Sequence, residues 1–288
     1  MAVTRSHMST QAMARRRAYV KGRDDPECAA TSESTKPNIS AAPSAILMML
    51  IGICAVTAAR TCLEELGLQL ARRDSDFDAT HAQHLLRQLC TPWPRIAGSP
   101  AAEETTVALL LRELHDIAEV ARGSGALLEM ETHSGSGSFY NDFLDGHVQA
   151  YANITSVVAR LSWPQSTGDA LLLAAHYDSF PTSPGSSDNA VQVSAALGSL
   201  RALASRRTTH MHDVLVLLNG AEESVLIGAH SFAVGHRWAR DYRAVLNLEA
   251  IGAGPPFVAF QLGPDAAWLA GALGTARGMR GTVIAHDL

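Results

Sequence analysis

The sequence predicts an α/β fold, in which a mostly parallel β-sheet is sandwiched by helices. Short apolar runs at 171–175, 214–218 and 244–248 have the length of buried strands. Segments with the pattern of helices lie between them, at about 188–204 and 223–235. Such strand–helix–strand alternation is typical of a parallel sheet with helices on both faces. The 288 residues are enough to build a large hydrophobic core.

Four features are expected before this alternation begins. Residues 74–89 start with acidic residues of the kind that cap helices, and residues 101–121 have the pattern of an amphipathic helix. Residues 147–161 alternate between apolar and polar positions and contain β-branched residues, which favours a strand. The glycine and serine run around Gly135 indicates a turn ahead of that strand.

The N-terminal region is organised differently. Residues 1–40 are polar and aperiodic, as in a disordered tail. Residues 41–59 contain no charged residue and are roughly long enough for a transmembrane helix through about 30 Å of hydrocarbon. Basic residues precede this segment and acidic residues follow it, so the positive-inside rule predicts a signal anchor with a cytosolic tail. A buried helix and a cleaved signal peptide are the alternatives. A linker at 60–80 then leads to a domain at 81–288, on the lumenal side.

Charge and cysteine content argue against two kinds of site. The net charge is −5 and only 18% of the residues are charged, so no basic surface for a nucleic-acid partner is expected. The four cysteines form no C-x-x-C pair, which argues against a zinc site made of thiolates. Cys62 and Cys90 could form a disulfide in an oxidising compartment or remain two free thiols, and the sequence leaves both possibilities open.

Ionisable residues follow each of the three apolar runs. In open α/β sheets, ligands bind beyond the carboxyl ends of the strands, so these side chains should meet at one edge. They follow the runs at 171–175, 214–218 and 244–248 in turn, and one opens the helix after the first run: His176 and Asp178, Glu222 and Glu223, Glu249, and Asp188.

A cluster of carboxylates around one imidazole would repel itself without a cation, and a metal ion is its natural counter-charge. Oxygen and imidazole ligands without thiolate suit zinc, although manganese or cobalt would also fit. Taken singly, an H-x-D sequence is ordinarily a surface loop, and a Glu-Glu pair is ordinarily a solvated helix start. Their joint arrival at strand ends makes the signal specific. Neither the G-x-S-x-G elbow of serine hydrolases nor the H-E-x-x-H zinc motif is present.

The motifs around these residues resemble a known group of enzymes, the zinc-dependent exopeptidases of the aminopeptidase S and carboxypeptidase Q type. Within that group the chain resembles the endoplasmic reticulum metallopeptidase 1 (Felix-ina) branch, and the likeness runs from about Thr80 to the end. It rests on these motifs: "AAHYDS", "SSDNA", "NGAEESVLIGAHSF", "AVLNLEAIGAGPPFVAFQLGP", "GSGSFYNDFLDG" and "YANITSVVARL". It implies a fold of the zinc-exopeptidase, phosphorylase/hydrolase-like kind.

The resemblance implies a site with two zinc ions. His176 would bind one metal, Asp188 would bridge both, and Glu223 would bind the second. Glu249 would take the place where many relatives have aspartate and this branch has glutamate.

The resemblance also implies two residues that act without binding metal. Glu222 would be the general base that takes a proton from the attacking water. Asp178 would accept the second ring N–H of His176 and thereby fix its tautomer.

One ligand of the family's pattern is missing from this sequence. Family members take a further histidine for the second zinc from a segment well downstream, and this chain stops at "GTVIAHDL". His286 lies in a stretch where relatives carry no ligand. The chain therefore resembles a C-terminally truncated form with an incomplete fold, expected to bind at most one zinc firmly and to be inactive.

The implied function of the complete protein is that of a membrane-anchored metallo-exopeptidase, an aminopeptidase, of the endoplasmic reticulum membrane with a lumenal catalytic domain and peptide substrates. In that topology Asn153, in "NIT", is a glycosylation acceptor, whereas Asn38, in "NIS", stays cytosolic and unmodified. Two alternatives of other classes are a non-catalytic receptor or scaffold ectodomain and a single-zinc, glutaminyl-cyclase-like transferase. The sequence carries no signal for the substrate side chain or the oligomeric state.

Overall fold

The computed structural model describes residues 42–73, 76–142, 146–250, 259, 263 and 267–275. The tail at 1–40 with Asn38, and the C-terminal His286, lie outside the described residues. The chain divides into two units, Met1–Arg60 and Thr61–Leu288, and the sheet belongs to the second.

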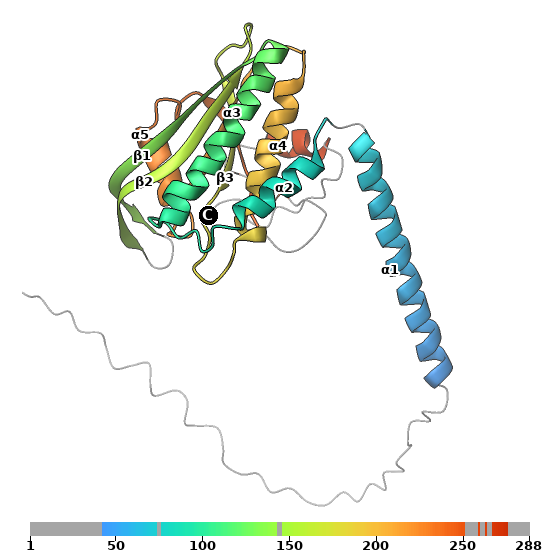
Figure 1. The fold of residues 1–288 in the computed structure, drawn as a ribbon. Helices are drawn as coiled ribbons and strands as arrows, with labels where there is room; N and C mark the ends of the chain where they lie inside the picture. The colour runs from blue at the N-terminus through green and yellow to red at the C-terminus, as the bar shows by residue number, and fades with distance from the viewer. Residues whose placement is uncertain are drawn as a thin grey trace, which may run out of the picture. The chain divides into compact units, whose positions relative to one another are not determined.

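Five strands form one sheet in the order β1-β2-β4-β3-β5 (Figure 1). Their bounds are β1 (Leu127–Asn141), β2 (His147–Ser162), β3 (Ala170–His176), β4 (Asp213–Asn219) and β5 (Tyr242–Asn247). The neighbours β4, β3 and β5 are parallel, as the alternation of apolar runs and helices predicted.

The expectation of a mostly parallel sheet is wrong for the other half. β1 pairs with β2 antiparallel, and β2 pairs with β4 antiparallel, so the sheet is mixed. The reason is the connection, because only five residues separate the end of β1 from the start of β2. A parallel pair needs a crossover of a dozen residues or more, so this link permits only a hairpin.

The turn predicted at Gly135 is also wrong, since Gly135 lies inside β1. The pairing of β1 with β2 shifts register between Gly135 and Gly137, which is a β-bulge. A Cβ atom at Gly135 would collide with the side chain of Ser231, in the helix that packs against β1. The glycine therefore serves close packing of a helix on the strand.

The helices cover both faces of the sheet, as predicted. α2 (Ala79–Leu89), α3 (Val107–Ser124) and α4 (Val191–Ser205) lie together on one face, and α5 (Ile227–Gly235) lies on the other (Figure 1). Short π-helical turns, η2 (Ala101–Thr106) and η3 (Ser186–Ala190), precede α3 and α4, and α6 (Ala267–Gly274) is a separate short helix. Each face of the sheet has its own apolar core, formed with the helices that cover it.

The first of these helices is capped by an acidic residue, as predicted, although it begins at Ala79 rather than at residue 74. Asp78 is the N-cap of α2, and its Oδ1 accepts the backbone N–H groups of Thr80 and His81 at 3.0 Å each. The helix expected at 223–235 begins later, at Ile227, because Val225 and Leu226 have φ angles of 66° and 64°, outside the helical region. The four residues before Ile227 thus form a turn.

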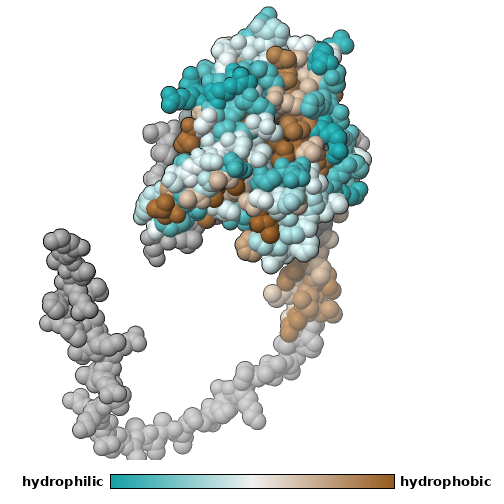
Figure 2. All heavy atoms as spheres, turned by 60° about the vertical axis from the view of Figure 1, so that its left-hand side comes forward, coloured by the Kyte–Doolittle hydropathy of each residue, from teal (hydrophilic) through white to brown (hydrophobic). Residues whose placement is uncertain are grey.

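The helix α1 (Ala42–Arg73) contains the segment expected to cross the membrane. Its large apolar side chains between Ile46 and Val56 are exposed, and Figure 2 shows this segment in brown. In the part of the chain that the structure describes, no helix is both long enough and apolar enough to span a membrane.

Of the two possibilities left open for the cysteines, the structure has free thiols. Cys62 is exposed and unpaired, and Cys90 lies at the end of α2, where its Sγ is 3.3 Å from Ser186 Oγ. The described part of the chain therefore offers no disulfide between Cys62 and Cys90.

Candidate functional site

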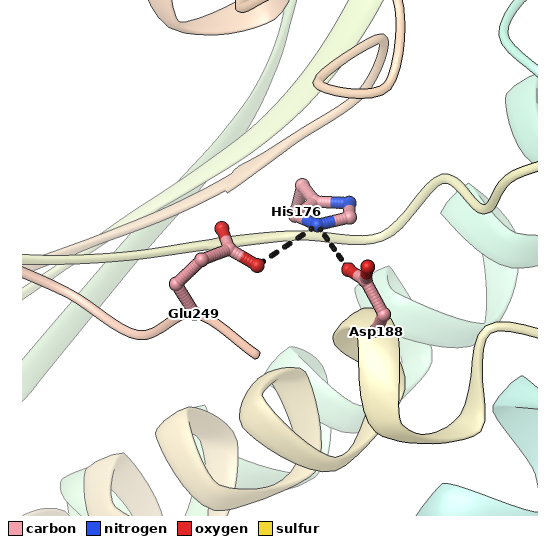
Figure 3. Close-up of side chains that lie close together, drawn as sticks. All are labelled: His176, Asp188 and Glu249. Carbon is pink, nitrogen blue, oxygen red and sulfur yellow. Dashed lines mark hydrogen bonds and ion pairs between the residues drawn. The ribbon is translucent and has the colours of Figure 1, made fainter. Parts of the chain in front are cut away.

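The carboxyl ends of the three parallel strands bring four of the predicted residues together. His176 is the last residue of β3, Glu222 follows β4 after two residues, and Glu249 follows β5 after one. Asp188 comes from the turn η3, which lies beside the end of β3. Figure 3 shows Asp188 and Glu249 approaching the imidazole of His176 from two sides.

One ring nitrogen of His176 is the centre of this cluster. Its Nε2 lies 3.0 Å from Asp188 Oδ1, 3.5 Å from Glu249 Oε1 and 3.6 Å from Glu222 Oε2. Ligand atoms of His176, Asp188 and Glu249 all lie within 4.8 Å of one another, a spacing that allows them to hold one metal ion. Among the described residues this is the group of His, Cys, Asp and Glu side chains that meets that spacing.

The imidazole of His176 is buried and surrounded by negative charge. Burial alone would lower its pKa, but the contacts with Asp178 and Glu249 and the charge of Glu222 raise the pKa of His176 to about 11. Without a cation the ring therefore carries the positive charge that balances the carboxylates. A metal ion at the same place would supply that charge and leave the ring neutral.

Asp178 connects the ends of β3 and β4. Its Oδ1 lies 3.3 Å from His176 Nδ1, a close contact that is not aligned as a hydrogen bond. Its two carboxylate oxygens accept the backbone N–H groups of Glu222 and Glu223, each at 3.1 Å. Asp178 therefore lies beside the ring, but the predicted hydrogen bond to its second N–H does not form in this geometry. The two backbone bonds, which the sequence did not indicate, tie the turn after β4 to the end of β3.

Asp188 is placed by irregular backbone and by its neighbour. Its φ and ψ of −128° and 89° are extended within the turn η3. The adjacent Asn189 is fully buried, and its Nδ2 donates to the carbonyl of Leu248 at 2.8 Å. Because Leu248 directly precedes Glu249, this bond fixes the backbone of Asp188 relative to that of Glu249. Sequence reasoning missed Asn189, whose only signal was its place in "SSDNA".

Glu222 is the carboxyl group with the most altered acidity in the cluster. Burial raises its pKa, the charge of His176 opposes that rise, and the charge of Glu249 adds to it, so that the pKa of Glu222 is about 7. A carboxyl group with such a pKa exchanges protons readily near neutral pH. Its neighbour Ala221 has a φ of 58°, which turns the chain sharply after β4.

Glu223 lies apart from the group of three. Burial is the largest cause that raises its pKa, and the charge of Asp188 is the next, so its carboxylate lies within electrostatic reach of Asp188.

The pKa of Glu249 is shifted in the opposite direction. Burial would raise its pKa, but the hydrogen bonds with His176 and with the N–H of Ala250, at 2.9 Å, hold the pKa below its ordinary value.

A pocket of about 280 Å³ opens beside the cluster, on the face of the sheet that α5 covers. His176, Glu222 and Glu249 form its polar end. Its remaining wall is mostly apolar and comes from the strands and from α5 with its preceding turn, with these residues among others: Leu172, Ala174, Leu217, Leu226, Phe232 and Val245. The cluster thus adjoins a cavity in which part of a substrate could bind.

The predicted glycosylation acceptor lies on the surface of β2. Asn153 is exposed, and its backbone N–H donates to Ser136 Oγ at 2.9 Å. The structure makes its side chain accessible, whereas modification remains a prediction.

Several known proteins are similar to this chain in sequence, and others are similar to it in fold. The human endoplasmic reticulum metallopeptidase 1 is 37% identical over 239 residues, which are 83% of this chain and 26% of that protein. The vacuolar membrane protease of Candida albicans is 38% identical over 40% of this chain and 13% of that protein. The mouse and rat metallopeptidases are matched over 30% and 29% of their length, so the chain spans less than a third of these relatives.

The similarity of fold extends to solved structures of bacterial proteins. The LapA aminopeptidase of Legionella pneumophila has a TM-score of 0.52 at 15% identity, over 78% of this chain and 57% of that chain. LapB from the same organism has a TM-score of 0.51 at 18% identity, over 73% of this chain and 56% of that chain. At such low identity these likenesses show the fold alone.

The match to a protein family covers the part of the chain that carries the candidate site. It extends over residues 156–286 and so includes His176 at the end of β3, Asp188 in η3, Glu222 and Glu249. The resemblance expected from the motifs is confirmed, because residues 156–286 match peptidase family M28 and most of the chain is similar to endoplasmic reticulum metallopeptidase 1.

Proposed function

We propose that this chain is the metal-binding part of a membrane-associated exopeptidase, an aminopeptidase that hydrolyses peptide bonds with an activated water. One observation carries the proposal: Nε2 of the buried His176 faces the carboxylates of Asp188, Glu249 and Glu222 at 3.0–3.6 Å. The match to peptidase family M28 and the similarity to human endoplasmic reticulum metallopeptidase 1 support the same reading.

The donor set fits zinc. One imidazole nitrogen and two carboxylate oxygens, from His176, Asp188 and Glu249, are ligands that catalytic zinc sites use, and three protein ligands leave a position open for water. When bound, the metal supplies Lewis-acid activation of the scissile carbonyl and of a water molecule.

The remaining chemistry belongs to side chains of the cluster. Glu222, which lies beside the candidate ligands, accepts a proton from the attacking water and delivers it to the leaving amine. Asp178 accepts the backbone N–H of Glu222, which fixes the position of that residue, and its negative charge lies 3.3 Å from the other ring nitrogen of His176.

A second zinc position is part of the proposal for the complete protein. Asp188 would bridge the two ions and Glu223 would bind the second, as the resemblance implies. Burial is the main cause that raises the pKa of Glu223, and the charge of Asp188 adds to the rise, which is consistent with a second position beside the first. Since Glu223 is outside the group of three, the first position is the better defined.

We further propose the endoplasmic reticulum membrane as the location, with the catalytic domain lumenal. The names of the metallopeptidase relatives support the compartment. The exposed apolar side chains of α1 support attachment through 41–59, and the basic residues before them support a cytosolic tail.

Replacing Glu222 by Gln should abolish peptide hydrolysis while zinc remains bound, because an amide cannot take a proton from water but fills the same space. Turnover of aminoacyl reporter substrates and zinc content are measured together in a form of the chain lengthened to match its relatives, because this chain by itself is expected to be inactive. The matched control is Glu119→Gln, an exposed glutamate on α3 paired with Arg122. Undiminished turnover in the Glu222 variant would disprove its role as the base. No zinc in the wild type would favour a scaffold, and cyclisation of N-terminal glutamine without hydrolysis would favour the transferase.

Replacing Asp178 by Asn should weaken zinc binding by about 10- to 100-fold, the usual effect of losing a partner of a ligating histidine. The amide would also present an N–H₂ group to one of the backbone N–H donors of Glu222 and Glu223. Zinc affinity is measured by competition with a chelator, and Asp116→Asn, an exposed aspartate on α3, is the control. Equal affinities in wild type and variant would contradict the assigned role.

The topology is tested by glycosylation in cells. If 41–59 anchors the chain with its tail in the cytosol, Asn153 carries a glycan, and Asn153→Gln removes the mobility shift that an endoglycosidase produces. Asn38→Gln serves as the control and should leave the shift unchanged. A shift that survives in the Asn153 variant would show that the acceptor or the orientation is wrong.

A further inference from the structure

A fully buried arginine holds the loop between His176 and Asp188. Arg95 lies between α2 and η2, and its guanidinium donates to the carbonyls of three segments. Nε donates to Tyr177 O at 2.8 Å, and Nη1 donates to Leu89 O at 2.7 Å and to Pro184 O at 2.8 Å. Nη2 donates to Gly185 O at 3.3 Å. The end of α2 and both ends of the loop are thereby joined at one side chain.

The same segment is also bound through its backbone. The N–H of Arg95 donates to Ser179 Oγ at 3.1 Å, and the N–H of Ser179 donates to the carbonyl of Arg95 at 3.0 Å. Tyr177 directly follows His176, and Gly185 comes three residues before Asp188. Arg95 therefore fixes the span that separates the first candidate ligand from the second.

The Arg95 guanidinium is buried without a carboxylate of the described residues to balance its charge in an ion pair, which suggests that its directed hydrogen bonds have a role beyond filling space. No ion pair of Arg95 with a carboxylate occurs among the described residues, and carbonyl oxygens accept its hydrogen bonds instead. Burying a cation without a carboxylate partner is unfavourable, so the hydrogen bonds to these four carbonyl oxygens must offset its desolvation. A guanidinium gives what an apolar residue does not, a fixed set of directed bonds to the loop.

Gly185 provides an independent sign that the loop is fitted to this side chain. Its φ is 62°, which favours glycine, and an added Cβ would lie 2.6 Å from Arg95 Nη2 and 2.8 Å from the carbonyl oxygen of Asp188. Gly185 thus lies between the Arg95 guanidinium and the backbone of Asp188. A displacement of the guanidinium would therefore shift the backbone of Asp188.

We propose that Arg95 is a positioning residue for the candidate metal centre, which acts through Gly185 and the turn η3 to set the place of the Asp188 carboxylate beside His176. This inference rests on the proposed function, since it gives the positioned carboxylate a metal to bind. Arg95 is not itself a candidate ligand, and it acts only through the loop backbone to which it donates hydrogen bonds.

Lysine cannot replace arginine in this role. An ammonium group has three donors around one nitrogen, whereas Arg95 makes four bonds from three nitrogens set in a plane. Arg95→Lys keeps the charge and most of the volume, and it removes the planar fork. The variant therefore separates the geometry of the side chain from its charge.

The chain offers a matched control in Arg160. It is also largely buried, and it donates to Asp213, Asp241 and the carbonyl of Gly168 at 2.7–2.8 Å. These partners lie at or before the amino ends of the parallel strands, the opposite edge of the sheet from His176. Arg160→Lys disturbs a buried arginine network of similar size without touching the loop.

The experiment compares wild type, Arg95→Lys and Arg160→Lys in the full chain. Zinc affinity is measured by competition with a chelator, cobalt(II) absorption reports the coordination geometry, and hydrogen exchange reports opening of residues 177–190. Arg95→Lys should weaken zinc binding by about 10- to 100-fold, alter the cobalt spectrum and speed exchange in the loop. Arg160→Lys should lower the melting temperature to a similar degree with wild-type zinc affinity and spectrum. If Arg95→Lys does not fold, Ser179→Ala, which removes one bond to the Arg95 N–H, should show the same changes to a smaller extent.

The outcomes distinguish this inference from the proposed function. Equal losses of zinc affinity in the two arginine variants, or unchanged affinity and spectrum in Arg95→Lys, would overturn the positioning role. Absence of zinc binding in the wild type would contradict the proposed function. In that case the exchange data still decide whether Arg95 holds the loop, and unchanged exchange at 177–190 would overturn that too.

Discussion

The candidate site depends on one electrostatic constraint, the approach of three carboxylates to a single nitrogen of the buried His176. Carboxylate oxygens of Asp188, Glu249 and Glu222 lie within 3.6 Å of that nitrogen, so the three negative charges repel one another. Such an arrangement is stable only with a positive charge at its centre, which is either the protonated imidazole or a metal ion. The raised pKa of His176 and the lowered pKa of Glu249 reflect the attraction between the ring and the carboxylates, whereas burial is the main cause of the raised pKa of Glu222.

The fold meets this constraint by fixing backbone rather than by packing the ligands themselves. Asp178 ties the turn after β4 to the end of β3, and Asn189 ties η3 to the residue before Glu249. Arg95 donates to backbone carbonyls at both ends of the loop that precedes Asp188. These three polar side chains are almost completely buried, so each bond that they make to the backbone is protected from competition by water.

The sequence predicted the convergence because apolar runs that end in His176, Glu222 and Glu249 must present those ends at one edge of a parallel sheet. It did not predict the antiparallel pairing of β1 with β2. That direction follows from the short link between the two strands, whereas the glycine and serine run indicated a turn at a position that lies inside β1. The sequence placed the start of α5 four residues early, because the left-handed Val225 and Leu226 have no signature in the sequence. Buried polar anchors such as Arg95 are likewise invisible without coordinates, because their partners are backbone carbonyls that any residue supplies.

The central claim is that His176, Asp188 and Glu249 together bind a catalytic metal ion. Anomalous diffraction at the zinc edge, from crystals of the chain grown with zinc, tests it directly. The account predicts an anomalous peak bonded to His176 Nε2 and to one oxygen each of Asp188 and Glu249, at about 2.0–2.2 Å. A peak bonded to other residues, or a zinc-saturated crystal with no peak at this cluster, would contradict it.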